Sequence, residues 1–372
     1  MAMPNFATSN STVDAAKQIS TTNKAQSGLA LLIQAYCNSV NEQPAVDFTG
    51  ITGLEQAQAA INAGLATAQA HANNYLNNIQ PNIITNIANI GNYYALHNAV
   101  ATTLPPGTSK ADWIAALTAL STQSAAYQTA ANGVVTSLNT LHANLTADTA
   151  SFAGAVSNLN AAVNGDNGVL ASDRAEVDAL QSKIDGAIAG VALSGLAIAG
   201  GVFLVAVGGI ADFVTAGTST PLVVAGIAVV AAGIGGEVAS ALTLSNLNSQ
   251  KATLLQQEST LTTEVALATG ISSGYSSLGT QVKNAVDAAT AMENAWNFLS
   301  SDLGSLITDL NNGTVDDGIL QKVFLTAANT VIQTLIQDIT TIKSQMTGIT
   351  TITVAPGQTV GEAIVAAARK AA

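Results

Sequence analysis

Side chains able to do acid–base, nucleophilic or metal chemistry are few in this sequence and do not form a recognisable motif. The three histidines, His71, His97 and His142, lie on helix-like stretches with neither an HExxH motif nor a nearby cysteine. Metal sites and catalytic centres need several such groups at defined spacings. The chain also has no GxxxxGK[ST] phosphate loop. We therefore expect no catalytic residue, no cofactor-binding residue and no metal ligand, and an enzyme is the least favoured class.

The remaining reactive groups have structural interpretations. Cys37 is the only cysteine, which excludes an internal disulfide and a thiolate cluster. It lies among Ile33 and Tyr36, so we expect a small buried side chain. Asp316 and Asp317 fit the first turn of a helix, where acidic side chains interact favourably with the helix dipole. These residues therefore predict packing and capping rather than chemistry.

Composition favours helices and excludes one class of partner. Of 372 residues only 9% are charged and 4% aromatic, and the formal net charge is −12. Such an acidic chain repels phosphate backbones, so we expect no nucleic acid partner, and any attraction to a membrane must be apolar. The first residues, MAMPNFATSNSTV, lack a basic segment and an apolar segment, so we expect no standard cleavable signal.

Apolar residues at spacings of three and four predict an all-α fold, an elongated bundle of about five long helices. We expect a kink where Pro81 interrupts one stripe, because the apolar phase continues beyond it. From Leu120 the seam uses spacings of three and four, and it continues to Val191 at intervals of seven, which predicts a helix that runs from Lys110 into the first arm and, if unbroken, as far as Ala211. The predicted helical stretches lie near residues 13–41, 53–97, 110–211, 278–310 and 319–346, with a return segment at 247–268 before the fourth.

The C-terminal tail has a different pattern. Residues 349 to 354 form a short β-prone run, and Pro356 and Gly357 predict a turn after it. The stretch from 359 to 371 is compatible with a small capping helix whose Arg369 and Lys370 suit its C-terminal dipole. The sequence suggests no function for this tail.

These helices lie before and after one apolar stretch, residues 186–236, and the third of them is predicted to run into it. It contains 26 uncharged residues between Asp185 and Asp212 and another 24 between Asp212 and Glu237. Each arm therefore meets the length of roughly 20 residues that a helix needs to cross a bilayer. A pair of buried core helices is the alternative. We favour membrane contact, because buried helices seldom run so long without a cap or charge and here two follow each other.

The sequence assigns roles within this apolar stretch by residue type. Glycines serve as hinges, or alternatively let helices approach closely, as the spacing of Gly186, Gly190 and Ser194 would allow. The expected hairpin tip is Asp212, Thr218 and Pro221, and the candidate hinges are Gly186, Gly200, Gly201, Gly235 and Gly236. The expected membrane-inserting residues are Ile188, Val191, Leu193, Leu196, Ile198, Val202, Phe203, Leu204, Val205, Val207, Ile210, Phe213, Leu222, Val223, Val224, Ile227, Val229, Val230 and Ile234.

The flanks of the apolar stretch argue against a resident membrane protein. No Lys or Arg occurs from Ile184 to Gln250, so no basic cluster fixes an orientation. The segment 187–236 holds 20 Leu, Ile, Val and Phe residues. At about 1.5 to 3 kcal/mol each, exposing them to water would cost tens of kcal/mol. A soluble state must therefore cover this stretch, either against the long helices or between protomers.

A helical bundle with a hydrophobic hairpin in mid-sequence resembles the α-helical pore-forming toxins that include cytolysin A, haemolysin BL, Nhe and tripartite toxins of Gram-negative bacteria. The resemblance implies tail helices over 1–185 and 237–372 and a hydrophobic hairpin head domain over 186–236. It implies a secreted toxin that causes cytolysis or haemolysis by inserting into the host cell membrane. Target-cell lipid bilayer, homo-oligomer neighbours and other toxin components are the implied partners.

The arms indicate which toxin component this chain resembles. From Val191 to Ile210 and from Leu222 to Ile234 they are apolar on every side, which is similar to the membrane-spanning, B-type component of a tripartite toxin. Two alternatives remain open. One is a secretion-system translocator or a membrane-anchored helical coiled-coil protein. The other is a helical scaffold or adhesin whose apolar centre is only core.

Overall fold

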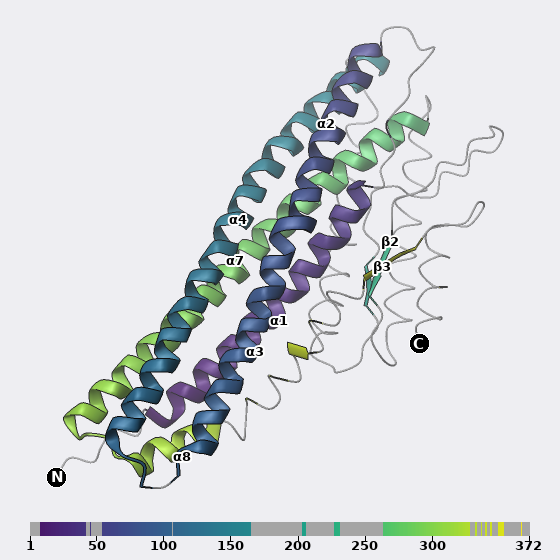
Figure 1. The fold of residues 1–372 in the computed structure, drawn as a ribbon. Helices are drawn as coiled ribbons and strands as arrows, with labels where there is room; N and C mark the ends of the chain where they lie inside the picture. Colours follow the sequence, from purple (N-terminus) through teal and green to yellow (C-terminus); the bar gives the residue numbers. More distant parts are fainter. Residues whose placement is uncertain are drawn as a thin grey trace. The chain divides into compact units, whose positions relative to one another are not determined.

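The computed structural model describes residues 8–41, 54–105, 107–164 and 263–327, three short strands, and the single positions 45, 332, 336, 339, 340, 343 and 366. Long helices dominate these residues and confirm the predicted all-α bundle (Figure 1). The helices are α1 (Thr8–Asn41), α2 (Glu55–Asn74), the π-helical turn η1 (Tyr75–Ile79), α3 (Gln80–Thr103), α4 (Lys110–Asn164), α7 (Thr263–Asn312) and α8 (Asp317–Ala327).

The interruption predicted at Pro81 takes the form of a widened turn. Residues Tyr75–Ile79 form the π-helical turn η1 between α2 and α3, and the Gln80 N–H donates to the Tyr75 carbonyl five residues earlier. Proline has no N–H, and its ring crowds the carbonyl of the preceding turn, so a normal α-helical ladder cannot continue through it. The π turn absorbs this mismatch, and the helix continues beyond it as the sequence predicted.

Helix α4 is the longest described element, with 55 residues, or about 80 Å at about 1.5 Å per residue. Its first turn is capped reciprocally: the Asp112 N–H donates to Ser109 Oγ, and Ser109 Oγ–H donates to Asp112 Oδ2. Its buried positions alternate by fours and threes, the spacing of helices packed along their length. They include Trp113, Leu117, Leu120, Ser124, Ala131, Val134, Leu138, Leu141, Leu145 and Phe152.

Helix α8 begins as the sequence predicted. Asp316 Oδ1 accepts a hydrogen bond of 2.8 Å from the Ile319 N–H, so Asp316 caps the helix, and Asp317 is its first residue. Gly313, with φ +71°, makes the turn that separates α7 from α8. The left-handed backbone at this position suits glycine, because any other residue would place a Cβ against the following carbonyl.

The described part of the apolar stretch corrects one expectation. Residues Phe203–Val205 form strand β1, so no continuous helix runs from Lys110 to Ala211. Ile227–Val230 form strand β2 in the second arm. Valine and isoleucine are stiff at χ1 and fit a pleated surface, which is the physical reason that these segments can adopt strands. The expectation that both arms are helical is therefore wrong for these residues in this structure.

A third strand joins the two arms. Ile349–Ile352 form β3, which confirms the β-prone run of the tail, and the sheet order is β1-β2-β3 with both pairs antiparallel. In register, Leu204 lies opposite Val229, and Val229 lies opposite Thr350. The C-terminal tail is therefore hydrogen-bonded through β3 to the second arm of the apolar stretch.

The chain divides into two compact units. Unit 1 comprises Met1–Ser27, Pro81–Ser137 and Ala285–Ser344, and unit 2 comprises Gly28–Gln80, Leu138–Asn284 and Gln345–Ala372. Helices α1, α4 and α7 contribute residues to both units. The predicted division at residues 186 and 236 falls outside the described residues.

Candidate functional site

Strands β1 and β2 contain the only predicted membrane-inserting residues that the structure describes. They bring Phe203 opposite Val230 and Leu204 opposite Val229, with Val205 opposite Ala228. The two arms of the predicted hairpin therefore meet in antiparallel register. The other predicted residues lie outside the described residues: Ile188, Val191, Leu193, Leu196, Ile198, Val202, Val207, Ile210, Phe213, Leu222, Val223, Val224, Ile234, the tip (Asp212, Thr218, Pro221) and the hinges (Gly186, Gly200, Gly201, Gly235, Gly236).

Sequence reasoning missed β3 as a partner of the apolar stretch. The signal was present in ITTI at 349–352, but nothing in a single sequence shows which segment such a strand will join. An isolated two-stranded hairpin is marginally stable in water, and a third strand adds the pairing that it lacks. Ile227 pairs with Ile352 and Val230 with Ile349, so β3 follows β2 along all four residues.

Unit 1 has a core built from aromatic rings. Trp296 on α7 contacts Tyr93 of α3 at a centroid distance of 5.4 Å and Tyr127 of α4 at 5.3 Å. At α8, the Phe324 ring stacks on His97 with centroids 4.4 Å apart. Aromatic pairs at such distances contribute beyond the area that they bury. The core of unit 1 therefore joins α3, α4, α7 and α8.

His97 is wholly buried in this aromatic core. Burial disfavours the charged imidazolium and lowers the pKa of His97 to about 4. Neither ring nitrogen has a hydrogen-bond partner among the described residues. The same holds for the Tyr93 hydroxyl, and burial raises the pKa of that phenol, with smaller contributions from Tyr94 and Asp302. His97 is therefore part of the core packing of unit 1.

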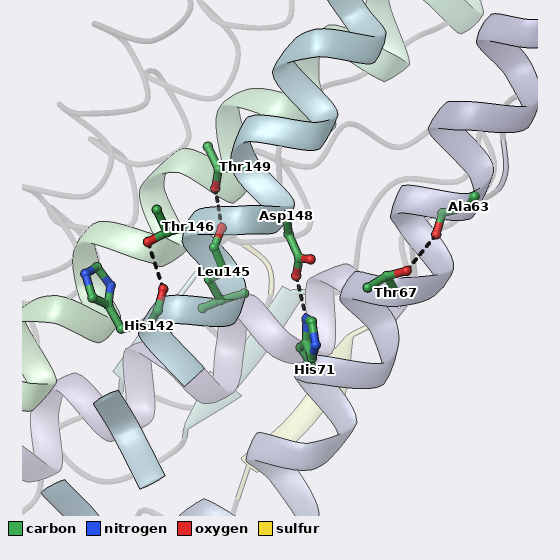
Figure 2. Close-up of polar contacts among 8 residues, drawn as sticks. All are labelled: Ala63, Thr67, His71, His142, Leu145, Thr146, Asp148 and Thr149. Atoms are coloured by element: carbon green, nitrogen blue, oxygen red, sulfur yellow. Dashed lines mark hydrogen bonds and ion pairs between the residues drawn. The ribbon is translucent and has the colours of Figure 1, made fainter. Parts of the chain in front are cut away.

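Among its described residues, unit 2 contains one histidine–carboxylate pair (Figure 2). His71 Nδ1 on α2 lies 2.6 Å from Asp148 Oδ2 on α4, and the Asp148 side chain is only 8% exposed. The hydroxyl of Thr149, next to this aspartate, donates to the Leu145 carbonyl of its own helix. The pair therefore connects α2 with α4.

Helices α1, α2 and α4 also pack closely in unit 2. The buried Tyr75 hydroxyl donates to the Ala30 carbonyl of α1 at 2.8 Å. Gly64 approaches Phe152 so closely that a Cβ at residue 64 would lie 2.9 Å from Phe152 Cε2. Cys37 is buried as predicted, and burial raises the pKa of its thiol, which keeps it protonated.

The described residues contain no group of three or more histidine, cysteine, aspartate or glutamate side chains placed to hold a metal ion. Among those residues, no helix is both long and apolar enough to span a bilayer.

Comparison with known proteins identifies the family. The model of the Bacillus haemolytic enterotoxin (HBL) family matches residues 14–187. Soluble AhlB of the tripartite α-pore-forming toxin AHL from Aeromonas hydrophila is 45% identical, with 94% of this chain and 99% of that chain covered and a TM-score of 0.85. The chain belongs to the family of tripartite α-pore-forming toxin B components. No protein of curated function matches the sequence.

Two further structures relate this conformation to the states of such toxins. Soluble SmhB of the tripartite toxin Smh from Serratia marcescens is 38% identical, covering 96% of this chain and 99% of that chain, with a TM-score of 0.86. The AhlB pore is 41% identical over 91% and 99% of the two chains, but its TM-score is only 0.63. As a B-type component, the protein is a pore-forming toxin subunit, and its TM-scores are higher against the two soluble relatives than against the AhlB pore. The family assignment therefore replaces the translocator and scaffold alternatives.

Proposed function

We propose that this protein is the lipid-inserting component of a secreted bacterial tripartite toxin, and that residues 186–236 are its inserting element. In the soluble form this stretch is kept from water. At the host cell membrane it is released and inserts, and several copies assemble into a pore with other toxin components. The proposal is supported by the family, by the length of the two uncharged arms, and by the pairing of both arms in one sheet.

The observation that carries this proposal is the β1-β2-β3 sheet. Its strands have three, four and four residues. A membrane-spanning strand needs about 9–11 residues, and an open sheet edge cannot lie in hydrocarbon. The sheet is therefore a conformation that the two arms can adopt in water but not in the bilayer core. Insertion requires β1 and β2 to separate from β3 and rearrange into helices, whose backbone hydrogen bonds are satisfied within each segment.

The magnitudes favour this rearrangement once lipid is available. The sheet has three paired positions between β1 and β2 and four between β2 and β3. At about 1 kcal/mol net per hydrogen bond, losing these pairs costs less than about 10 kcal/mol. Moving the 20 large apolar side chains of 187–236 from water into lipid gains about 30–60 kcal/mol, at about 1.5–3 kcal/mol each. Contacts that cover the stretch in the soluble form reduce this gain.

The composition of the arms explains the need for partners. From Val191 to Ile210 and from Leu222 to Ile234 neither arm has a polar face. A ring of such arms alone would line its channel with apolar side chains, which disfavours water in a narrow pore. A second component with an amphipathic element would supply the hydrophilic lining. AhlB and SmhB both belong to toxins of three components.

Liposome leakage tests the proposal. The purified chain is added to dye-loaded liposomes, alone and together with candidate A-type and L1-type components. We expect it to bind the liposomes by itself and to release dye most effectively with its partners. Absence of both binding and leakage in every combination would overturn the toxin function for this chain.

Val229→Asp tests the inserting element. Val229 lies in β2, opposite Leu204 and Thr350. A carboxylate in the bilayer core opposes insertion by about 2.5–3.5 kcal/mol on insertion scales, so leakage should fall at least about a hundredfold while the helical circular dichroism is retained. Asn297→Asp, an added charge on the exposed side of α7, is the matched control and should behave as wild type. Normal insertion of Val229→Asp would show that 227–230 is not inserted.

A further inference from the structure

Helix α8 is the shortest of the described α-helices, with 11 residues. It follows the turn at Gly313, where the chain leaves α7. Two of its side chains, Leu320 and Phe324, are fully buried. A helix of this length is marginal in water by itself, so α8 depends on the contacts that these side chains make within unit 1.

His97 provides the surface on which Phe324 packs. The two rings are stacked, with centroids 4.4 Å apart and an interplanar angle of 11°. Tyr93 and Tyr94 lie around the same imidazole, at centroid distances of 6.3 and 6.2 Å. Trp113 of α4 contacts Phe324 from another direction, at 5.8 Å. Phe324 is therefore held in a cluster of rings from α3 and α4, and His97 is the one member of this cluster that can gain a positive charge.

This ring cluster does not compensate a charged imidazole. Neither nitrogen of His97 has a hydrogen-bond partner, and none of the ion pairs found among the described residues includes it. Burying a charge without a partner is costly, and this burial is what lowers the pKa of His97 to about 4. Protonation therefore favours any conformation in which His97 reaches water.

The titratable groups around the ring cluster do not change this conclusion. On α3, burial raises the pKa of both Tyr93 and Tyr94, so their hydroxyls stay uncharged. On α7, the half-buried Asp302 contributes to the raised pKa of Tyr93. Burial is the one cause of the lowered His97 pKa, so none of these groups stabilises the imidazolium. The charged residues of α4 and α8 that flank the cluster are exposed: Lys110, Asp112, Asp316 and Lys322.

The adjoining end of α7 has its own attachment. Lys110 Nζ, at the start of α4, donates to the Asn311 carbonyl at 2.9 Å. Helix α8 is attached separately, through Phe324 and through Gln321 Nε2, which donates to the Leu104 carbonyl at 3.2 Å. The turn at Gly313 lies between these two attachments. Helix α8 can therefore leave the ring cluster while α7 keeps its place in the core of unit 1.

We propose that His97 is an acid-sensitive switch that holds α8 on unit 1 while it is neutral and releases α8 when it is protonated. Release brings the imidazolium into water and exposes Phe324, which explains why the docked form is preferred at neutral pH. The switch lies within unit 1 and goes beyond the proposed function. A failure of lipid binding would therefore leave this inference intact.

The two pKa values of His97 define the pH range of the switch. The value is about 4 with α8 docked and about 6.5, as in a solvated histidine, with α8 released. The released form therefore binds a proton at a higher pH than the docked form does. The ratio of released to docked α8 is lowest above pH 6.5 and rises as the pH falls towards 4. Between pH 7 and pH 5 it should increase about twentyfold.

Hydrogen exchange tests this increase in the unmodified chain. Amide exchange of residues 317–327 is followed by mass spectrometry at pH 7 and pH 5, and corrected for the pH dependence of intrinsic exchange. The protection factor of α8 should fall about twentyfold at pH 5, because it reports the ratio of docked to released helix. Residues 289–306 of α7, which include the buried Trp296, should keep their protection.

Two substitutions test the assignment to His97. His97→Phe and His97→Gln both remove the site of protonation, and the second variant covers the case in which the first does not fold. In each, the protection factor of α8 should change less than about twofold between pH 7 and pH 5. Asp316→Asn is the matched control, since asparagine still caps α8 but cannot be protonated. This control should respond to acid as wild type does.

Each of four results would overturn the inference. The protection factor of α8 in wild type could be the same at both pH values. An equal loss of protection in α7 would show that acid unfolds unit 1 as a whole. An unchanged acid response in the folded His97 variants would assign the switch to another group, and loss of the response in Asp316→Asn would assign it to the helix cap.

Discussion

The bundle and the apolar stretch use hydrophobic residues in opposite ways. In α4, buried residues such as Leu117, Leu120 and Leu138 recur at spacings of three and four, so one face is apolar and only one helical packing satisfies it. Around β1 and β2 nearly every residue is apolar, and no face is distinguished. Periodic hydrophobicity thus specifies one structure, whereas uniform hydrophobicity is compatible with strands in water and helices in lipid.

This comparison separates two kinds of effect. Changes in the bundle core should alter the free energy of unfolding and leave the lipid affinity of folded protein unchanged. Changes in the apolar stretch should alter transfer to lipid and leave the bundle stable. The predictions that follow concern the bundle, from the largest expected effect to the smallest.

Trp296→Ala should have the largest effect on stability. The Trp296 ring is 1% exposed and contacts Tyr93 and Tyr127. Its removal leaves a cavity between three helices and should lower the free energy of unfolding by about 3–5 kcal/mol. Urea denaturation followed by circular dichroism measures this, with the exposed Asn297→Ala as the control, expected to change stability by less than about 0.5 kcal/mol. Equal effects of the two substitutions would contradict the assigned core.

Acid should weaken the bundle through His97. The folded state lowers the pKa of His97 to about 4, against about 6.5 in an unfolded chain. Between these values the unfolded chain binds a proton that the folded chain does not. The resulting stability is therefore complete above pH 6.5 and lost as the pH falls towards 4. The loss amounts to about 3 kcal/mol at most.

His97→Phe isolates this contribution. Phenylalanine retains a ring beside Phe324 but cannot bind a proton. Urea midpoints at pH 7 and pH 4.5 should differ less for the variant than for wild type, because the proton that the unfolded chain takes up at residue 97 is no longer bound. An identical pH dependence in both proteins would show that His97 is already accessible to protons in the folded state.

Gly64→Ala should have the smallest effect on the free energy of unfolding, and the sign of this effect is informative. The added methyl would lie 2.9 Å from the buried Phe152 ring, so the usual gain in helix propensity is outweighed by overpacking, and stability should fall by about 1 kcal/mol. Gly154→Ala, on the same helix as Phe152, meets no atom within 4 Å and should raise stability by about 0.5–1 kcal/mol. If both changes stabilise the protein, α2 and α4 are farther apart than in this structure.

Local patterns predicted much of the bundle. The seam of α4, the buried Cys37, the Asp316 cap and the β-prone run at 349–352 all followed from neighbouring residues. The interruption at Pro81 was also predicted, but its form as a π turn was not. Whether the helix kinks or forms a widened turn depends on what packs against it.

Long-range partners could not be predicted from a single sequence. The His71–Asp148 contact joins residues 77 apart, and neither residue has a neighbour that indicates the other. The same holds for β2 and β3, since a short apolar strand can pair with many others. The strands β1 and β2 were expected as helical arms, because a run of 26 uncharged residues meets the length criterion for a membrane helix whatever its conformation in water.

The central claim is that the arms containing β1 and β2 leave the sheet and enter lipid. A polarity-sensitive fluorophore attached at Leu204→Cys, with Cys37 buried and unreactive, reports this transfer directly. On mixing with liposomes, the fluorescence should rise and shift to the blue, and quenchers carried on the lipid acyl chains should suppress it. A fluorophore that stays in water while the protein permeabilises the liposomes would contradict the account.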